Sequence, residues 1–163
     1  MFSQINSIGL FGLNAFMVTV QASISPGQPT FDIVGMPDIA VQESKARIRA
    51  VLGQLDLKLL NGRVTVNLAP ASVRKIGSMF DLPIITALMK LGGIITADLS
   101  DCAFIGELSL NGELSPVNGA LSMVLTAAKN GVKRVFLPKA NAKEASVADG
   151  ITVYGCLLYT SPS

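Results

Sequence analysis

Hydrophobic residues recur at the spacing of strands in some stretches of the chain and at the spacing of helices in others. Two short apolar runs in residues 2–20, interrupted by Gly9, Gly12 and Asn14, predict a β-hairpin. Further strands are predicted at residues 31–34, 63–68, 134–137 and 151–154, and helices at residues 80–91, 119–130 and 139–148.

The clearest helical pattern follows Asp38, whose carboxylate can accept a backbone N–H and cap a helix. Glu43 precedes Arg47 by four residues, an arrangement that stabilises a helix surface by about 0.2–0.5 kcal/mol. The apolar stripe predicts one amphipathic helix, which packs on a core through Ala40, Val41, Ser44, Ile48, Val51, Leu52 and Leu55.

A second hairpin is predicted within residues 103–114, where Asn111-Gly112 suits a type I′ turn because both central residues need a positive φ. Residues 69–79 form a predicted loop. Because strands occur both in hairpins and in alternation with helices, the order of elements predicts an α+β fold. We expect a mixed β-sheet with packed helices rather than a doubly wound parallel sheet.

Composition places limits on this fold. A length of 163 residues suits a single domain. Half of the residues are hydrophobic and only 15% are charged, against about 25% in typical domains. So small a share of charge predicts that some apolar surface meets another domain or subunit.

Several kinds of chemistry are excluded by missing residue types. The chain contains no histidine, which removes a Ser-His-Asp triad and any zinc site that uses histidine. It also contains no Gly-Lys pair, which the phosphate-binding loop of an ATPase needs. No apolar run approaches the roughly 18 residues of a membrane span, and no basic segment precedes the apolar start. We therefore expect a soluble, cytoplasmic protein without a membrane partner.

Two longer motifs point to a family. Residues 35–52 read GMPDIAVQESKARIRAVL and residues 67–88 read NLAPASVRKIGSMFDLPIITAL. Both resemble the YifB/ComM family of AAA+ ATPases, which are similar to magnesium-chelatase subunits of the ChlI type. The resemblance implies the two-layer fold of the Lon proteolytic domain, also found in the C-terminal domain of RadA and in the second domain of a small-subunit ribosomal protein.

The same resemblance implies how the chain is organised. Residues 1–155 correspond to the family's N-terminal domain, and residues 156–163, CLLYTSPS, resemble a translated adapter more than family sequence. We expect this tail to be non-native and the natural protein to continue past Gly155. No cofactor is then expected in this chain, and ATP and magnesium are implied for an ATPase domain that lies downstream.

The Lon-like region lacks the residues of the protease's Ser-Lys dyad. Aligning Lys75 and Gly77 with the Lon motif places Met79 at the nucleophile's position and Leu121 at the position of the general-base lysine. Neither side chain can attack a carbonyl or take up its proton. Ser72 or Ser78 could pair with Lys75 instead, but the adjacent Arg74 suggests an exposed, charged loop rather than a desolvated lysine. We expect no catalytic residue and no metal site.

Basic residues gather in two places, on the predicted first helix and in the loop after residue 69. These candidate contacts to DNA or to a protein partner are Lys45, Arg47, Arg49, Arg74 and Lys75. The alternative is that the charges merely solvate a helix face and a loop, and the chain has no dense basic run or interleaved aromatic residues. Asp81 has no second acid nearby, so we expect it to cap the helix that begins at Leu82.

By this resemblance the chain is the non-catalytic N-terminal module of a hexameric ATPase that processes branched DNA during transformation. The expected partners are its own downstream AAA+ domain, other copies of itself, and DNA. The module would support ring assembly or engage DNA. Two alternatives stay open: a residual Lon-like Ser-Lys peptidase, and a partner domain of a magnesium-chelatase type complex.

Overall fold

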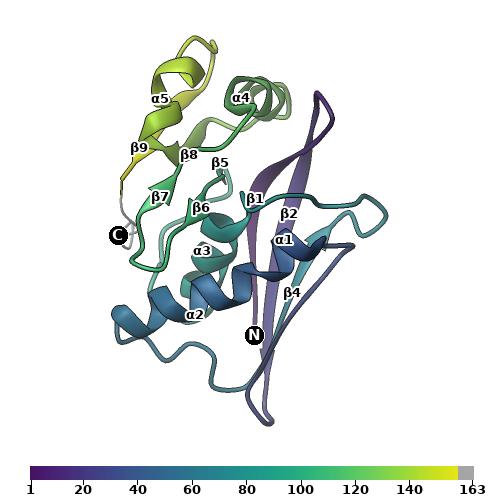
Figure 1. Cartoon of the computed structure of the whole chain (residues 1–163), viewed down its shortest axis with the longest axis vertical. Coiled ribbons are helices and arrows are strands. Elements are labelled where there is room, and N and C mark those ends of the chain that lie inside the picture. The colour runs from purple at the N-terminus through teal and green to yellow at the C-terminus, as the bar shows by residue number, and fades with distance from the viewer. Residues whose placement is uncertain (158–163) are drawn as a thin grey trace.

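The computed structural model of the protein describes residues 1–157, which form a twisted β-sheet with helices packed against it (Figure 1). The elements in chain order are β1 (Phe2–Phe11), β2 (Asn14–Ser25), β3 (Thr30–Val34), α1 (Ile39–Gln42), α2 (Ser44–Gln54), β4 (Arg63–Ala69), α3 (Asp81–Leu91), β5 (Cys102–Phe104), β6 (Glu107–Leu108), β7 (Leu114–Ser115), α4 (Ala120–Lys129), β8 (Arg134–Pro138), α5 (Lys139–Ala145) and β9 (Thr152–Cys156).

Seven strands form the main sheet in the order β3-β4-β2-β1-β5-β8-β9, while β6 and β7 pair separately. The long hairpin β1–β2 and the pair β2–β4 are antiparallel. The remaining pairs, β3–β4, β1–β5, β5–β8 and β8–β9, are parallel. This mixture of antiparallel and parallel pairs confirms the α+β class with a mixed sheet.

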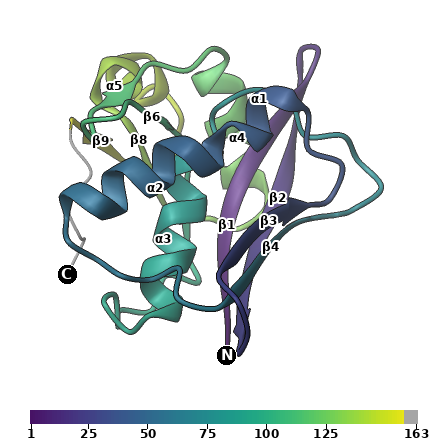
Figure 2. The same ribbon diagram turned by 60° about the horizontal axis from the view of Figure 1, so that its bottom comes forward.

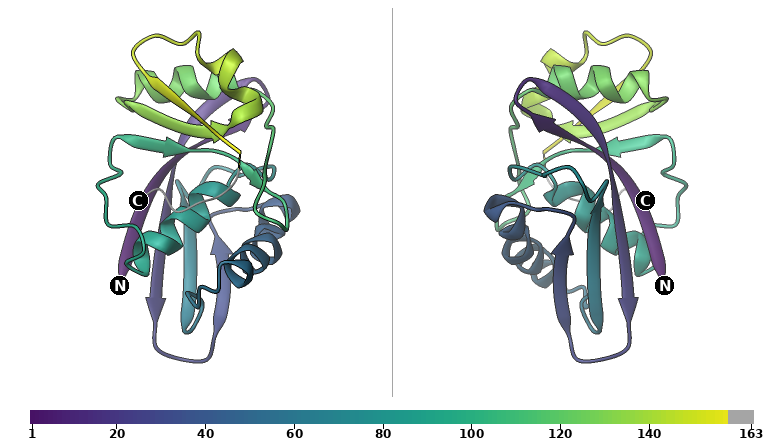
Figure 3. Two further views of the ribbon diagram at one scale, coloured as in Figure 1. Left: turned by 90° about the vertical axis from the view of Figure 1, so that its left-hand side faces the viewer. Right: turned by 90° about the vertical axis from the view of Figure 1, so that its right-hand side faces the viewer.

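Helices lie on both faces of the sheet, toward different ends of it (Figure 3). Helices α1, α2 and α3 cover one face through the larger core, which includes Ile5, Val20 and Val66. Helices α4 and α5 cover the opposite face through a second core around Ile8 and Val135. The sheet therefore has a two-layer arrangement at each end, and its central strands are covered on both faces.

The segment after Asp38 is two helices, because Glu43 separates the single turn of α1 from α2. Figure 2 shows α2 crossing over α3. Five positions of the predicted stripe are buried, namely Val41, Ser44, Ile48, Val51 and Leu52. The prediction was wrong for Leu55, which is exposed because α2 ends at Gln54 and the chain turns away from the core.

The hairpin between β6 and β7 does not use the predicted type I′ turn. The N–H of Gly112 donates to the carbonyl of Ser109 over 3.0 Å. Gly112 has a φ of 88°, whereas Asn111 is not among the non-glycine residues with positive φ. Instead, the Asn111 side-chain oxygen accepts hydrogen bonds from the Ser109 hydroxyl and the Glu113 N–H, at 2.5 and 3.1 Å. These local bonds favour an ordinary turn that is followed by one left-handed glycine.

Within residues 1–157, no helix is both long and apolar enough to cross a bilayer, and the longest helices have 11 residues. The expected non-native tail falls mostly outside the described part, since residues 158–163 are not described. Cys156 ends β9, and the Leu157 carbonyl accepts the Leu114 N–H over 2.9 Å. The proposed boundary at residue 155 stays a prediction.

Candidate functional site

The two sequence motifs meet at one corner of the molecule, where the turn before α1 lies against the loop after β4. Pro37 and Lys75 form an isolated parallel bridge. The Asp38 N–H donates to the Lys75 carbonyl over 2.9 Å, and the Lys75 N–H donates to the Met36 carbonyl over 3.0 Å. We call residues 34–39 and 70–77 together the two-loop tip.

Lys75 holds the two loops together from inside. Its side chain is completely buried, and the Nζ donates to the Gly35 carbonyl over 2.7 Å and to the Pro70 carbonyl. Desolvation lowers the pKa of Lys75. The expectation of an exposed Lys75 in a charged loop was therefore wrong, because the carbonyls of both loops turn inward around its ammonium group. A buried Lys75 is not available to a DNA phosphate.

The first loop adopts an uncommon backbone conformation at two consecutive residues. Gly35 has a φ of 103°, and a Cβ placed there would overlap the Leu68 carbonyl, so only glycine fits without movement. Met36 has a φ of 58°, in the left-handed region that costs a residue with a Cβ roughly 1–2 kcal/mol. Met36 is also more than half exposed, so burial of its own side chain does not offset this strain.

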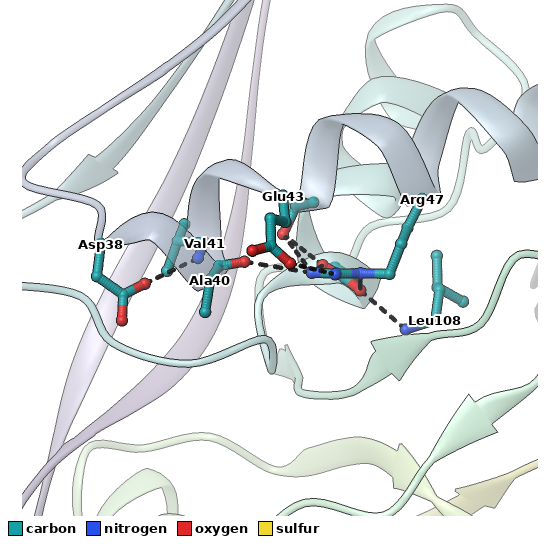
Figure 4. A network of polar contacts seen from close by, with 8 residues as sticks. Asp38, Ala40, Val41, Glu43, Arg47 and Leu108 are labelled. Carbon is teal, nitrogen blue, oxygen red and sulfur yellow. Dashed lines mark hydrogen bonds and ion pairs between the residues drawn. The ribbon is translucent and has the colours of Figure 1, made fainter.

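Asp38 caps the first helix, as predicted, and also ties it to the second loop (Figure 4). Its Oδ1 accepts the Val41 N–H over 2.8 Å and caps α1. Its Oδ2 accepts the Gly77 N–H over 3.3 Å, which ties the second loop to the same carboxylate.

A second cluster of polar contacts connects α2 to α3 (Figure 4). The Arg47 Nε lies 2.6 Å from Oδ2 of Asp81, and its Nη2 lies 3.1 Å from Oδ1. The Ser44 hydroxyl also donates to Asp81, and the Leu108 N–H donates to it over 2.9 Å. Burial raises the pKa of Asp81, and the bonds from Arg47, Ser44 and Leu108 offset part of that rise.

These contacts correct the role predicted for Asp81. The side chain does not cap α3, whose N-cap is Phe80, but leaves its own helix to bind two side chains of α2. Sequence reasoning missed Ser44 and Leu108 as partners. Ser44 carried a usable signal, because a polar residue inside an otherwise apolar stripe needs a buried partner.

The five candidate basic residues do not act as one group. Arg47 points inward to Asp81 and pairs with Glu43 only at 3.9 Å, while Lys75 is buried in the tip. The Arg49 guanidinium lies 5.6 Å from the centre of the Phe31 ring. Lys45 is half-buried and Arg74 is exposed. Contact of Lys45, Arg49 or Arg74 with DNA stays a prediction.

The positions aligned with the Lon dyad lie in an apolar environment. Met79 and Leu121 are both half-buried and pack against the second core. The Lys75 Nζ donates to backbone carbonyls, and within the described residues no hydrogen bond joins it to Ser72 or Ser78. No group of three or more acidic, cysteine or histidine side chains suited to a metal ion occurs in that part of the chain either. The polar side chains described above therefore form hydrogen bonds and an ion pair inside the protein, which connect its loops and helices.

Comparison with known proteins agrees with the motifs. The family model described as subunit ChlI of Mg-chelatase matches residues 20–141. The competence protein ComM of Haemophilus influenzae is 36% identical over 144 residues, which cover 88% of this chain and 28% of ComM. The uncharacterized protein YifB of Escherichia coli is 34% identical over 157 residues, covering 96% of this chain and 30% of YifB. A Lon protease of Mycolicibacterium smegmatis is 26% identical over 159 residues, covering 90% of this chain and 20% of the protease. The chain thus spans less than a third of the length of these relatives.

Proposed function

We propose that this chain serves as the non-catalytic N-terminal module of an AAA+ ATPase of the YifB/ComM type. The premise is that the chain belongs to the family of subunit ChlI of Mg-chelatase. Its task in that protein is to hold copies of the ATPase together in a ring, in the cytoplasm. ATP and magnesium would bind to the ATPase domain, and processing of branched DNA during transformation would belong to the whole protein.

One observation carries this proposal: four polar side chains of the two motifs, Asp38, Arg47, Lys75 and Asp81, are engaged in contacts inside the protein. Lys75 and Asp38 bind backbone groups of the tip, and Arg47 binds Asp81 between two helices. A catalytic acid, base or nucleophile must reach a substrate atom. Because these residues bind the protein itself, they suit a module that is kept in one shape to be recognised.

Assembly is favoured over DNA engagement by what remains on the surface. Two of the five candidate basic residues, Arg47 and Lys75, are engaged in the interior. The tip exposes Val34, Met36, Ile39 and Ile76, and the chain as a whole carries few charges. Apolar surface of this kind is typical of contacts between proteins, whereas DNA binding depends on several accessible cations.

The solution mass and the DNA affinity of the chain test this choice. Light scattering should report a mass above the 17.0 kDa of one chain, increasing with concentration. A labelled branched DNA is titrated at about 50–200 mM salt against two triple variants that lose the same charge. We expect the Lys45→Ala/Arg49→Ala/Arg74→Ala variant to bind this DNA no more weakly than the Lys129→Ala/Lys133→Ala/Lys143→Ala control. A monomer whose salt-sensitive DNA binding is lost only in the first variant would make DNA engagement the function instead.

The residual peptidase is tested separately. We expect no ATP-independent cleavage of casein, since Met79 and Leu121 stand at the aligned dyad positions. Cleavage that disappears in Ser78→Ala and persists in Ser72→Ala would contradict the non-catalytic assignment and identify a displaced nucleophile.

A further inference from the structure

Four Asn-Gly dipeptides occur in this chain, at residues 61–62, 111–112, 118–119 and 130–131. An asparagine before a glycine is prone to spontaneous deamidation, because the absent Cβ lets the glycine nitrogen approach the asparagine side chain closely. The fold places the four dipeptides in different surroundings, and hydrogen bonds hold only some of them. From these surroundings we propose that Asn118 is a site of spontaneous deamidation, while Asn111 and Asn130 are protected from it.

The reaction uses groups of the chain and solvent alone. Hydroxide removes the proton from the Gly119 nitrogen, which then attacks Cγ of Asn118. A bond forms between these two atoms, the bond from Cγ to Nδ2 breaks, and Nδ2 leaves as ammonia after taking a proton from water. Water then opens the cyclic imide at either of its carbonyls and yields aspartate or isoaspartate, with no oxidation or reduction. The glycine N–H and the asparagine side chain must therefore both be free to react.

The dipeptide at residues 111–112 is hydrogen-bonded at both reacting groups. The Gly112 N–H donates to the Ser109 carbonyl over 3.0 Å. Oδ1 of Asn111 accepts the Glu113 N–H over 3.1 Å, which restrains the side chain. A donated N–H loses its proton less readily, and a restrained side chain must break its hydrogen bond before it can turn. We therefore expect slow deamidation at Asn111, although this residue is exposed.

The dipeptide at residues 130–131 is held in the same way at the end of α4. The Gly131 N–H donates to the Ala128 carbonyl over 3.2 Å. Nδ2 of Asn130 donates to the Thr126 carbonyl over 2.8 Å. Asn130 is exposed as well, so exposure by itself does not separate a reactive asparagine from a protected one.

Asn118 and Gly119 lie in the segment between β7 and α4 and are both exposed (Figure 1). Within residues 1–157, the Asn118 side chain forms no hydrogen bond. Gly119 takes part only through its carbonyl, which accepts the Met123 N–H over 3.1 Å. Solvent hydroxide can reach an exposed N–H that no carbonyl holds. Both requirements of the reaction are thus met at this dipeptide.

Residues 61–62 are an intermediate case. Asn61 is exposed, and neither its side chain nor the Gly62 N–H is hydrogen-bonded in the part of the chain that the structure describes. Gly62 is buried, however, and a Cβ placed on it would lie 2.7 Å from the Ser25 carbonyl oxygen. Burial limits the access of hydroxide and water, so we expect Asn61 to deamidate more slowly than Asn118.

Deamidation at residue 118 would alter the connection between α4 and α5. Asn141 of α5 binds Val117, the residue before Asn118, through both polar atoms of its side chain. Its Oδ1 accepts the Val117 N–H over 2.9 Å, and its Nδ2 donates to the Val117 carbonyl over 2.8 Å. Isoaspartate adds a methylene group to the backbone directly after this contact, whereas aspartate adds only a negative charge. We expect the isoaspartate form to unfold at a lower temperature than the aspartate form.

Peptide mass spectrometry of the full chain, aged at mildly alkaline pH, measures deamidation at each of the four sites. In guanidinium chloride the four asparagines should react at similar rates, because each is followed by glycine. In the folded chain Asn118 should react at least about tenfold faster than Asn111 and Asn130, whose hydrogen bonds must break first. Equal rates at these three sites in the folded chain would overturn the proposal.

Two variants identify the site and the route. Asn118→Gln should remove the main acidic species from ion-exchange chromatography of the aged chain, because a longer side chain closes the ring much more slowly. Asn130→Gln is the matched control and should leave that species in place. The peptide that contains residue 118 should hold both isoaspartate and aspartate. Aspartate alone would mean that water attacks Cγ directly, and attack by the Gly119 nitrogen would be overturned.

This chemistry does not depend on the assembly function proposed above. A chain that stays monomeric and deamidates at Asn118 would support the modification site and contradict the assembly function. A chain that self-associates and shows no preference for Asn118 would do the reverse.

Discussion

Arg47 on α2 and Asp81 on α3 form an ion pair that links the two sequence motifs, with the Arg47 Nε 2.6 Å from Oδ2 of Asp81. The Asp81 side chain is fully buried and that of Arg47 is 16% exposed. Ser44 and the Leu108 N–H complete the ring of donors around the carboxylate. The pair therefore connects α2, α3 and the end of β6, which adjoin the larger core.

Removing one partner of this pair should destabilise the protein strongly. We expect Asp81→Leu and Arg47→Met each to lower the free energy of unfolding by about 3–5 kcal/mol, because each leaves a buried group unpaired. The double variant should lose much less than the sum, which urea unfolding in a double-mutant cycle will measure. Glu43→Gln is the control, expected to cost less than about 0.5 kcal/mol at its exposed, 3.9 Å contact. Additive losses in the cycle would show that Arg47 and Asp81 are not coupled.

Lys75→Met tests the buried lysine. The variant leaves the Gly35 and Pro70 carbonyls without their donor, so we expect a loss of about 1–3 kcal/mol in the free energy of unfolding. Arg74→Met, in the same loop but exposed, should cost less than about 0.5 kcal/mol. Equal losses from the two substitutions would contradict the internal role of Lys75.

The stability of the protein should also depend on pH through Lys75. Burial lowers its pKa in the folded state, so between that value and the ordinary lysine pKa near 10.4 the unfolded chain binds more protons. Stability therefore rises with pH in this range, and the cost of burying the ammonium is fully present below it. The difference in unfolding free energy between the natural chain and Lys75→Met should widen as the pH is raised toward about 10.4. A difference that narrows would mean that the two carbonyls raise the pKa instead.

Gly35 and Gly131 separate the effect of backbone conformation from that of close packing. Both have positive φ, at 103° and 86°, but a Cβ at Gly131 would meet no atom within 4 Å. Gly131→Ala should cost about 1–2 kcal/mol, as expected for positive φ alone. Gly35→Ala should cost clearly more, since its Cβ would overlap the backbone of Leu68. Thermal unfolding of the two variants makes the comparison, and equal costs would show that the loop moves freely away from β4.

Met36→Asn should separate stability from association. Asparagine tolerates the left-handed region better than methionine, so we expect the free energy of unfolding to stay equal or to rise by about 1 kcal/mol. The same change removes an exposed apolar group from the tip and should weaken self-association. Chemical denaturation and ultracentrifugation of one sample measure the two effects. A variant that associates as tightly as the natural chain would exclude the Met36 side chain from the surface that mediates self-association.

Most of the local structure could be predicted from the residues themselves. The β1–β2 hairpin, the Asp38 cap and the helix closed by Gly92 follow from turn residues, capping chemistry and apolar spacing. The break at Glu43 and the end of α2 before Leu55 were missed, because they depend on how α2 meets the rest of the core. The short strand β5 was missed as well, since its three buried residues show no alternation.

The candidate site was predicted less well than the fold. Sequence reasoning placed Arg47 and Lys75 among exposed basic residues, because charged side chains are usually solvated. Their partners are carbonyls of Gly35 and Pro70 and the carboxylate of Asp81, which lie between 5 and 40 positions away. No local pattern indicates such partners. The polar Ser44 within an apolar stripe was the one local sign of a buried polar contact between helices.

The amino-acid sequence by itself determined the class of fold and the family, because these depend on residue types and on their spacing along the chain. Only the tertiary structure decided that Lys75 and Arg47 face inward and that Val34, Met36, Ile39 and Ile76 share one exposed tip. The physical reason is that burial and pairing are set by which distant segments meet. A lysine on a loop is solvated or enclosed according to the carbonyls that a second loop brings to it.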